Sequence, residues 1–374
     1  MTKLRFIGLD VHADTIAIAV AESDGDVRSL GIVPNRSESV RKAMKKLGPA
    51  EHLRVCYEAG PTGYVLYWQL TGLGIRCEVV APTLVPMKPG DRVKTDRRDA
   101  TKLARCYRAG DLTAVWVPDA AHEALRDLVR AREAAKKDQL RARQRLMKFF
   151  LRQGRRAPTK MTAWSSRHLA WVRQVTFEQP AHEATRLDYL HEVDHAADRI
   201  SRLERAIDTA VQAAPATMRA VIEALQALRG IARISAATIV AEVGELSRFT
   251  RARQFMGYCG MGPREASSGT SIRRFGITKT GNAHLRRIAI EAAWAYRHRP
   301  TIGSPLRKRQ ASLSPPIIAA AWKAQLRLYQ RYRHLLGRGK SSPHVTTAVG
   351  RELLGFIWAI GCAVERDHQH AHAA

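Results

Sequence analysis

The chain has 374 residues, of which 45% are hydrophobic, so it is long enough for two domains with sizeable cores and a connecting segment. Its 62 lysines and arginines against 34 aspartates and glutamates give a formal net charge of +28, which disfavours a compact free state and favours a polyanionic partner. The five scattered cysteines form no Cys-x-x-Cys pair, which argues against a disulfide framework and against a zinc site.

The positive charge is concentrated in two segments. Residues 231–340 carry 21 basic and 4 acidic residues, a balance of +17, and residues 101–155 carry 14 and 6, a balance of +8. Few solvated surfaces need so uneven a segment. We therefore expect nucleic-acid contact to centre on 231–340 with help from 101–155; the alternative is a basic surface that is merely solvated.

The N-terminal sequence, the cysteines and the longest apolar run predict the cellular compartment. The first residues lead directly into a strand pattern, so we expect no signal peptide. Unpaired cysteines suit a reducing cytosol, and we expect the protein in the bacterial cytosol, associated with the nucleoid. The longest apolar run, 353–364, is too short to span a bilayer and predicts a buried helix, with no membrane partner.

The N-terminal part alternates strands and helices. The predicted elements are strands over 4–10, 15–21 and 27–33, a helix over 37–47 with Ser37 as its N-cap, a strand over 53–58, a helix over 61–73, a strand over 76–81 and a helix over 97–108. Short turns between the first three strands favour an antiparallel meander. The order βββ-α-β-α-β-α is that of the ribonuclease-H-like fold, a mixed sheet between helices, which we assign to a domain over 1–115.

The middle of the chain is predicted to be helical. A long basic helix runs from Asp119, its N-cap, to about Gln153, and an irregular stretch follows over 154–180. From Pro180 to Ala213 apolar residues recur near heptad spacing, in a helix roughly 45 Å long at 1.5 Å per residue. This second helix is either a coiled-coil spacer or dimerisation arm, or an amphipathic helix packed on its own domain. Together these elements form a helical linker over 116–224.

A mainly helical second domain is predicted over 225–340, followed by a C-terminal helix and polar tail over 341–374. It begins with Leu228-Arg229-Gly230-Ile231-Ala232, which resembles a helix-hairpin-helix turn. Such a turn offers backbone N–H groups to a phosphate, here at Gly230. Ala232 stands where a second glycine is usual, so a plain helical hairpin is the alternative.

Four acidic residues form the first candidate site. Asp10 and Glu58 end the first and fourth strands, which are neighbours in this fold, and Asp96 and Asp99 share one face of the helix that packs across the first strand. Four crowded carboxylates repel unless cations neutralise them, and hard oxygen ligands suit Mg²⁺ or Mn²⁺. Two such ions could clamp the attacking and leaving oxygens of a phosphodiester exchange. The alternative treats each acid as an ordinary strand-end or helix-cap residue.

A serine-rich segment forms the second candidate site. Within 255–287, Ser267, Ser268 and Ser271 present hydroxyls in what we predict to be a flexible glycine-rich loop. Basic side chains near a hydroxyl suit phosphate binding and the stabilisation of a phosphoryl-transfer transition state. The candidate nucleic-acid-binding residues here are Arg264, Arg273, Arg274, Lys279, Arg286 and Arg287. The alternative is a basic loop that only grips the DNA backbone.

Four segments together resemble one known protein family. They read GLDVHADTIAIAV, VCYEAGPTGY, KTDRRDATKLAR and GMGPREASSGTSIRRFGITKTGNAHLRR, in this order. They look like the DEDD transposases of the Piv-invertase-like insertion-sequence family, whose members include the bridge-RNA-guided recombinases. The similarity runs from about residue 4 to 110 and from about 225 to 300. It implies a RuvC-like N-terminal domain and a C-terminal serine transposase domain.

The resemblance also implies roles for individual residues. The acids Asp10, Glu58, Asp96 and Asp99 match the family's metal-binding set, and Ser268 matches the serine that becomes covalently joined to DNA; Ser267, one position away, stays open. The family acts as a homo-oligomer, here a dimer or tetramer, in which one subunit's acids meet another's serine. A structured noncoding RNA selects the donor and target DNA.

The sequence therefore predicts a DNA transposase or site-specific recombinase that uses metal-bound acids and a serine nucleophile. The first alternative is a RuvC-like nuclease or Holliday-junction resolvase in which metal-activated water attacks DNA. The second is a non-catalytic RNA- or DNA-binding protein, to which the basic charge is equally suited.

Overall fold

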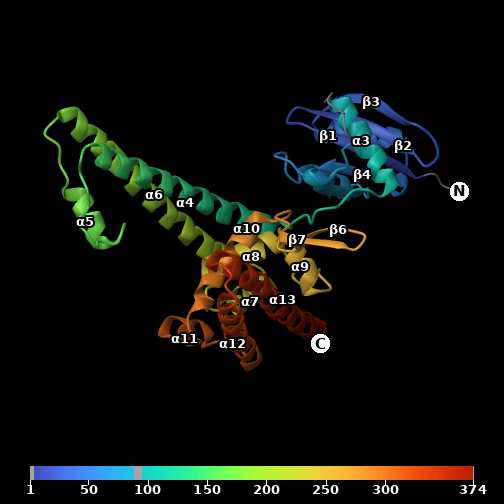
Figure 1. The fold of residues 1–374 in the computed structure, drawn as a ribbon. Coiled ribbons are helices and arrows are strands. Elements are labelled where there is room, and N and C mark those ends of the chain that lie inside the picture. The colour runs from blue at the N-terminus through green and yellow to red at the C-terminus, as the bar shows by residue number, and fades with distance from the viewer. Residues whose placement is uncertain (1–3, 88–94, 374) are drawn as a thin grey trace. The chain divides into compact units, whose positions relative to one another are not determined.

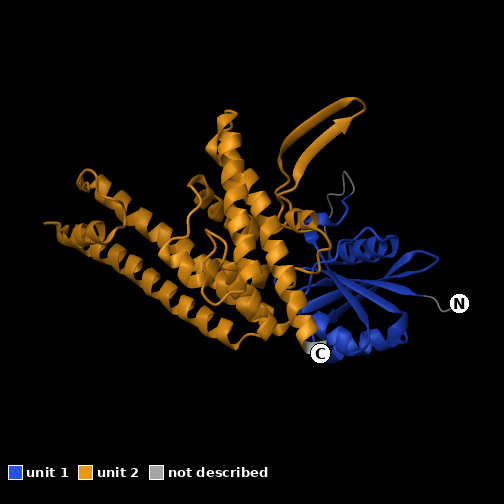
Figure 2. Cartoon of the chain, turned by 90° about the horizontal axis from the view of Figure 1, so that it is seen from below, with its two compact units in different colours: residues 1–117 blue, residues 118–374 orange. Residues whose placement is uncertain are grey.

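The computed structural model describes residues 4–87 and 95–373. Two compact units divide the chain, Met1–Val117 and Pro118–Ala374, coloured separately in Figure 2. The predicted boundaries after residues 224 and 340 both fall inside the second unit.

The first unit is built on a five-stranded mixed sheet. Its strands are β1 (Arg5–Val11), β2 (Thr15–Glu22), β3 (Val27–Pro34), β4 (Leu53–Glu58) and β5 (Arg76–Val80). They lie in the order β3-β2-β1-β4-β5, with β1, β2 and β3 antiparallel and β1, β4 and β5 parallel. Both β1 and β4 are therefore interior strands, and they are direct neighbours.

Helices cover both faces of this sheet. On one face, α1 (Ser37–Leu47) and α2 (Val65–Gly72) bury apolar side chains against odd-numbered strand residues such as Ile7, Leu9 and Val55. On the other face lies α3 (Asp96–Ala109), drawn in front of the strands in Figure 1. Short 3-10 helices span Ala50–His52 and Pro82–Leu84. The predicted ribonuclease-H-like arrangement of a mixed sheet between helices is confirmed.

Two predicted helix starts in this unit are wrong. The N-cap of α1 is Arg36, which caps without its side chain, and Ser37 is already the first helical residue. Helix α2 begins at Val65 because residues 61–64 form a turn, in which Gly63 has a φ of +66°.

The second unit contains a long pair of helices. Helix α4 (Ala120–Arg152) and α6 (Pro180–Ala213) run antiparallel, and α5 (Ser166–Gln174) interrupts the stretch predicted to be irregular (Figure 1). The predicted N-cap is confirmed, since Asp119 accepts a hydrogen bond from His122 N. The near-heptad residues Leu190 and Val193 pack against Leu146 and Phe150, so the apolar face of α6 is covered by its own chain.

The rest of the second unit is a helical bundle with one hairpin of strands. Its members are α7 (Ala216–Leu225), α8 (Arg233–Val243), α9 (Ala252–Tyr258), β6 (Pro263–Ser268), β7 (Ser271–Ile277), α10 (Ala283–Ala293), a 3-10 helix (Trp294–Arg297), α11 (Ser304–Gln310), α12 (Pro315–Gly337) and α13 (Ser342–Ala373). Apart from α11, these helices share one apolar core. The hairpin of β6 and β7 extends away from that body in both views (Figures 1 and 2).

Helix α13 includes the predicted apolar run and continues through the predicted polar tail. Among the described residues it is the one helix long and apolar enough to cross a membrane by length and composition, and half of its most apolar window is buried in the protein. Val349, Leu353 and Ile357 belong to the bundle core. The carboxylate of Glu365 is buried and accepts hydrogen bonds from the backbone N–H groups of Leu246 and Ser247, each at 2.7 Å. These contacts are those of a core helix.

Candidate active site

Close packing of α3 on the sheet sets the geometry of the acidic residues. A Cβ atom at Gly8 would overlap the backbone of Ala100 and Ala104, so only glycine lets α3 come so near β1. Alanines 17, 19 and 21 of β2 continue this shallow surface. Phe6 contacts Tyr107 at the far end of α3, with ring centroids 5.8 Å apart. Because alternate strand residues share a face, Phe6, Gly8 and Asp10 all lie under α3.

The N-terminal turn of α3 therefore lies beside Asp10. Thr95 is the N-cap, and Asp96 and Asp99 lie in the first turn. Ligand atoms of Asp10, His12 and Asp96 all lie within 4.8 Å of one another. His12 Nε2 is 3.3 Å from Asp10 Oδ2 and 3.5 Å from Asp96 Oδ1. The structure thus brings these two predicted acids together and adds a histidine that the sequence analysis missed.

The electrostatics of Asp10 reflect this crowding. Burial raises the pKa of the Asp10 carboxyl, the nearby Asp99 and Asp96 carboxylates raise it further, and His12 opposes them. The charged form of Asp10 is therefore disfavoured in the bare protein, and a cation among these oxygens would stabilise it.

Glu58 lies at the neighbouring strand end, on the same face. Gly8 pairs with Cys56 in the parallel register, and Cys56 Sγ donates to Leu103 O of α3 at 3.8 Å. Two residues further along each strand, Asp10 and Glu58 therefore also share the α3 face. Glu58 is exposed and is not part of the tight group of Asp10, His12 and Asp96.

Ser268 lies in the second unit, on a β-hairpin instead of the predicted flexible loop. Ser268 pairs with Ser271 across a two-residue turn, Gly269-Thr270. Gly269 has a φ of +56°, as the first turn position of a type II′ hairpin requires. Strand β6 contains no β-branched or aromatic residue, so its local sequence does not favour a strand, and pairing with β7 forms the hairpin.

The hairpin separates Ser267 from Ser268. Pairing puts Ser268, Ser271 and Arg273 on one face and Ser267, Glu265 and Arg274 on the other. On the second face, Ser267 Oγ donates to Glu265 Oε1 at 2.7 Å and Arg274 Nε lies 3.5 Å from Glu265 Oε2. The Ser267 and Arg274 contacts lower the pKa of Glu265. Within the described chain, the structure shows no such acidic partner for Ser268 or Arg273.

The root of the hairpin is tightly built. Lys279 adopts the left-handed conformation, with a φ of +59°, and its N–H donates to Gly260 O at 2.9 Å. A Cβ at Gly281 would overlap Tyr258 O. Asn282 caps α10 by accepting from His284 N and Leu285 N. These contacts fix the direction in which the hairpin leaves the bundle.

Two acidic residues anchor this root to α4 and α8. Glu242, 1% exposed, accepts a bidentate pair from Arg130 at 2.7 and 2.9 Å and a hydrogen bond from Asn282 at 2.8 Å. Glu133 binds His284 at 2.7 Å and Arg287 at 2.9 Å. Burial would raise the pKa of Glu133, but bonds from His284, Lys137 and Arg287 outweigh it and lower the pKa to about 2.

The remaining predicted nucleic-acid residues differ in their surroundings. Arg264 and Lys279 are exposed, whereas Arg286 donates to Cys259 O at 3.0 Å. Arg287 is held by Glu133 and, at 3.0 Å, by Glu291. Gly230 has a φ of +84°, and a Cβ there would lie 2.6 Å from Ala292 O, so this glycine is required by packing against α10. Its phosphate contact stays a prediction.

Comparison with known proteins covers both sites. Residues 7–153 match the transposase model DEDD_Tnp_IS110, and residues 222–306 match the model of the Transposase IS116/IS110/IS902 family. The first match includes all four acids, and the second includes Ser268 and the hairpin.

Similar proteins cover nearly the whole chain. A putative transposase, y4qE, of Sinorhizobium fredii is 47% identical over 360 residues, 95% of this chain and 88% of the relative. The transposase for insertion sequence element IS1533 of Leptospira borgpetersenii is 30% identical over 346 residues, 91% of this chain and 99% of the relative. The resemblance noted in the sequence is confirmed. The chain belongs to the IS116/IS110/IS902 family of transposases, enzymes that cut and rejoin DNA.

Proposed function

We propose that this transposase moves its insertion sequence by site-specific strand exchange, with Ser268 as nucleophile and a divalent metal held by Asp10, Glu58, Asp96 and Asp99. The observation that supports this most strongly is the environment of Ser268: a hydroxyl near a hairpin turn, on the face that also carries Arg273. A phosphate reached by such a hairpin would meet a hydroxyl and a guanidinium together.

The acidic site fits Mg²⁺ or Mn²⁺. Its donors are carboxylate oxygens, which these hard cations prefer. A cation among them would stabilise the charged form of Asp10, which burial and the neighbouring Asp99 and Asp96 disfavour. Among the described residues, His12 adds a nitrogen donor beside Asp10 and Asp96. When bound, the metal would neutralise charge on the scissile phosphate and on the oxygens that exchange there.

In the proposed reaction, the Ser268 hydroxyl displaces one oxygen of the DNA backbone. The Oγ–P bond of Ser268 forms as one bridging P–O bond of the DNA backbone breaks; the hydroxyl proton is lost and the departing DNA oxygen gains one. One phosphodiester replaces another, so the strand can be rejoined without an external energy source. Arg273 would stabilise negative charge on the attacked phosphate.

Divalent-metal dependence tests the acidic half of the proposal. Asp10→Asn should abolish strand cleavage while DNA and RNA binding stay near normal, because one metal ligand is lost but the basic surface is unchanged. Gel-resolved cleavage with Mg²⁺, Mn²⁺ or excess chelator measures this. Full cleavage by the variant, or by the wild type in chelator, would show that these acids do not hold a metal needed for cleavage.

The rival function is a nuclease or junction resolvase that attacks with water. Ser268→Ala separates the two, because a water-using enzyme would still cut DNA. We expect Ser268→Ala to bind DNA and yet give neither cleavage nor a covalent adduct. Ser267→Ala is the matched control and should retain both, since Ser267 is held by Glu265 on the opposite face. Normal cutting by Ser268→Ala would favour the nuclease.

A noncoding guide RNA is the proposed second partner. Basic surfaces beside the two candidate sites support it. In the first unit, Arg97, Lys102 and Arg105 of α3 line a cavity of about 810 Å³. In the second unit, Arg132, Lys136 and Arg143 of α4 line a cavity of about 450 Å³, which Glu133 and Glu291 also line. Purified RNA-free protein that recombines its element with normal site choice would refute an RNA guide.

A further inference from the structure

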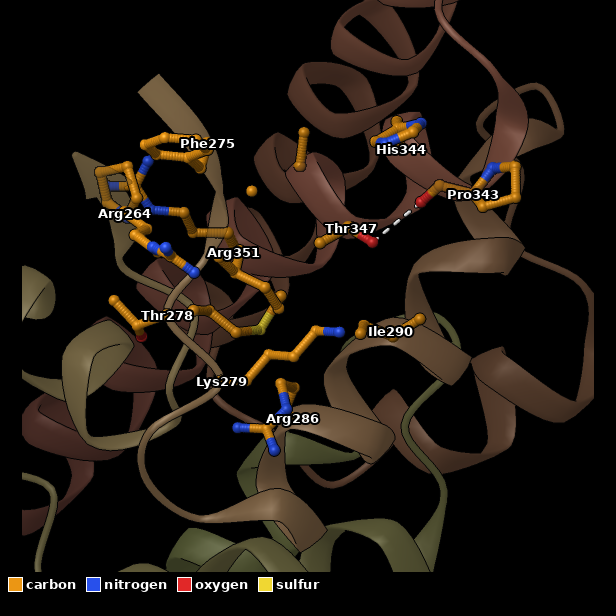
Figure 3. Close-up of a pocket in the computed structure, with 15 residues that line it drawn as sticks. Arg264, Phe275, Thr278, Lys279, Arg286, Ile290, Pro343, His344, Thr347 and Arg351 are labelled. Carbon is orange, nitrogen blue, oxygen red and sulfur yellow. Dashed lines mark hydrogen bonds between the residues drawn. The ribbon is translucent and has the colours of Figure 1, made fainter. Parts of the chain in front are cut away.

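A cavity of about 730 Å³ lies at the root of the hairpin (Figure 3). Its walls come from the start of β6, the end of β7, α10 and the first turns of α13. Pockets that hold a small organic ligand typically measure about 300–1,000 Å³. This cavity is therefore large enough for a single nucleotide. None of the four acids, nor Ser268, lines it, although Arg264, Lys279 and Arg286 are among the predicted nucleic-acid-binding residues.

One side of the cavity is strongly basic. Arg264, Lys279, Arg286 and Arg351 all line it, and none of the described lining residues is acidic. The Nε atom of Arg351 is buried without a hydrogen-bond partner among the described residues, although such a group normally has one. The positively polarised N-terminus of α13 lies across the cavity from these side chains, since Pro343 and His344 are in its first turn. This wall is suited to a phosphate group.

The same cavity has a flat aromatic and apolar wall. Phe275 lines it with 48% of its surface exposed, and Arg264 lies over its ring with the guanidinium carbon 4.9 Å from the centroid. Ile277 and Ile290 extend the apolar surface. In Figure 3, Arg264, Arg351, Lys279 and Arg286 gather on one side and His344 and Thr347 lie across the opening. Bases stack on aromatic rings and on guanidinium planes.

We propose that this cavity binds one nucleotide of the DNA strand, with its base against Phe275 and its phosphate near Arg351 and Arg286. The proposal rests on the proposed function, because the hairpin that carries Ser268 is what would bring the strand here. A base that enters the cavity must leave the duplex stack, as in other sites that read a single extruded base.

The length of β6 places this nucleotide away from the cut. Four to five residues separate the cavity residues Pro263 and Arg264 from Ser268. At about 3.3 Å per residue this is about 15 Å, which corresponds to roughly four or five steps along a stacked strand. The cavity would thus fix the register of the strand instead of holding the scissile phosphate.

Binding of simple probes to the full-length chain tests the proposal. The probes are thymidine 5′-monophosphate, thymidine and inorganic phosphate, titrated calorimetrically at moderate salt. We expect the monophosphate to bind at least about tenfold more tightly than either part alone. Phe275→Leu should remove that advantage and leave phosphate binding unchanged, whereas Arg351→Gln should weaken both ligands about fivefold or more.

Two controls complete the design. Arg333→Gln removes an equal charge from an exposed position of α12 outside the cavity and should change nothing. An eight-residue oligothymidylate should displace the monophosphate. If it cannot, the cavity takes a free nucleotide and its assignment to a DNA strand is overturned.

Other outcomes also contradict the proposal. Equal affinity for phosphate and for the monophosphate would mean that the cavity binds only a phosphate of the DNA backbone and does not bind a base. Unchanged binding in folded Phe275→Leu and Arg351→Gln would place the site elsewhere. All titrations use protein that also carries Ser268→Ala, so that no strand cleavage occurs during the measurement. The cavity can therefore bind a nucleotide even if Ser268 is not the nucleophile, and Ser268 can be the nucleophile even if the cavity binds nothing.

Discussion

At the scale of single residues, adjacent positions on the hairpin have different partners. Ser267 and Arg274 share a face with Glu265, which engages both side chains. Ser268 and Arg273 share the other face. A guanidinium already paired with a carboxylate has less charge to offer an incoming phosphate than one that is not.

This difference predicts unequal effects of two matching substitutions. Arg273→Gln should lower the rate of strand cleavage about tenfold or more, because it removes charge stabilisation at the attacked phosphate. Arg274→Gln should lower it only slightly. Single-turnover cleavage at saturating protein measures both rates. Equal losses would mean that the two faces of the hairpin do not differ in function.

The four acids could be identified from the sequence as a candidate site, because their positions follow from strand order and helix spacing. His12 was missed because it follows the last residue of β1, where strand alternation does not predict the direction of a side chain. The cavity lined by Phe275 and Arg351 could not be foreseen, because these residues are 76 positions apart and line one cavity only through the tertiary fold.

At the scale of elements, the contact between α3 and β1 depends on Gly8. Gly8→Ala should displace α3 and with it Asp96 and Asp99, because the new methyl group would overlap backbone atoms that cannot rotate away. We expect the free energy of unfolding to fall by about 1–3 kcal/mol. The cleavage rate should fall as well, by more than this loss of stability alone would cause. Urea unfolding and cleavage assays measure the two effects.

Gly72→Ala is the matched control for this change. Nothing lies within 4 Å of a Cβ at Gly72, the last residue of α2. The free energy of unfolding should therefore stay unchanged or rise by up to about 1 kcal/mol, and cleavage should stay within about twofold of the wild type. A Gly8→Ala protein with normal stability and activity would show that α3 is not held in place by this contact.

The link between α4 and α10 predicts a pH dependence. The pKa of Glu133 falls from 4.5 to about 2 in the folded protein, so the folded state favours the charged form. Its stabilisation is complete above about pH 4.5 and is lost as the pH falls toward 2. Near neutral pH, the free energy of unfolding of the wild type should exceed that of Glu133→Gln by on the order of 3 kcal/mol. Chemical unfolding from pH 3 to 7 measures this, and a pH-independent difference would contradict the assignment.

Most elements could be predicted from sequence, and the exceptions have physical causes. Helices α4 and α6 follow from long periodic patterns with clear caps or an initial proline. The local sequence of the hairpin favours a loop, because it is rich in glycine and serine. Cross-strand pairing between β6 and β7 stabilises strands that local preference does not. The partner of the apolar face of α6 could not be read from periodicity, which does not say whether a helix packs on its own chain.

At the scale of the whole molecule, the acids and the serine belong to different compact units. About 170 residues separate Asp99 from Ser268. From the family resemblance we propose that each complete site combines the acids of one subunit with the serine of another.

Mixing two inactive variants tests this sharing. Ser268→Ala and Asp10→Asn proteins should each be inactive, and their mixture should regain part of the wild-type activity, because mixed oligomers can form a site from two intact halves. Each variant alone at the same total concentration is the control. If both variants co-assemble and nothing is restored, Ser268 acts with the acids of its own chain.

The central claim is that Ser268 becomes covalently joined to DNA. The most direct measurement traps the protein–DNA adduct, digests the DNA with nuclease and the protein with protease, and sequences the nucleotide-bearing peptide by mass spectrometry. We expect the added nucleotide phosphate on Ser268, and no modified peptide from the Asp10→Asn protein. A nucleotide on Ser267 or Ser271, or complete cleavage without any adduct, would contradict the account.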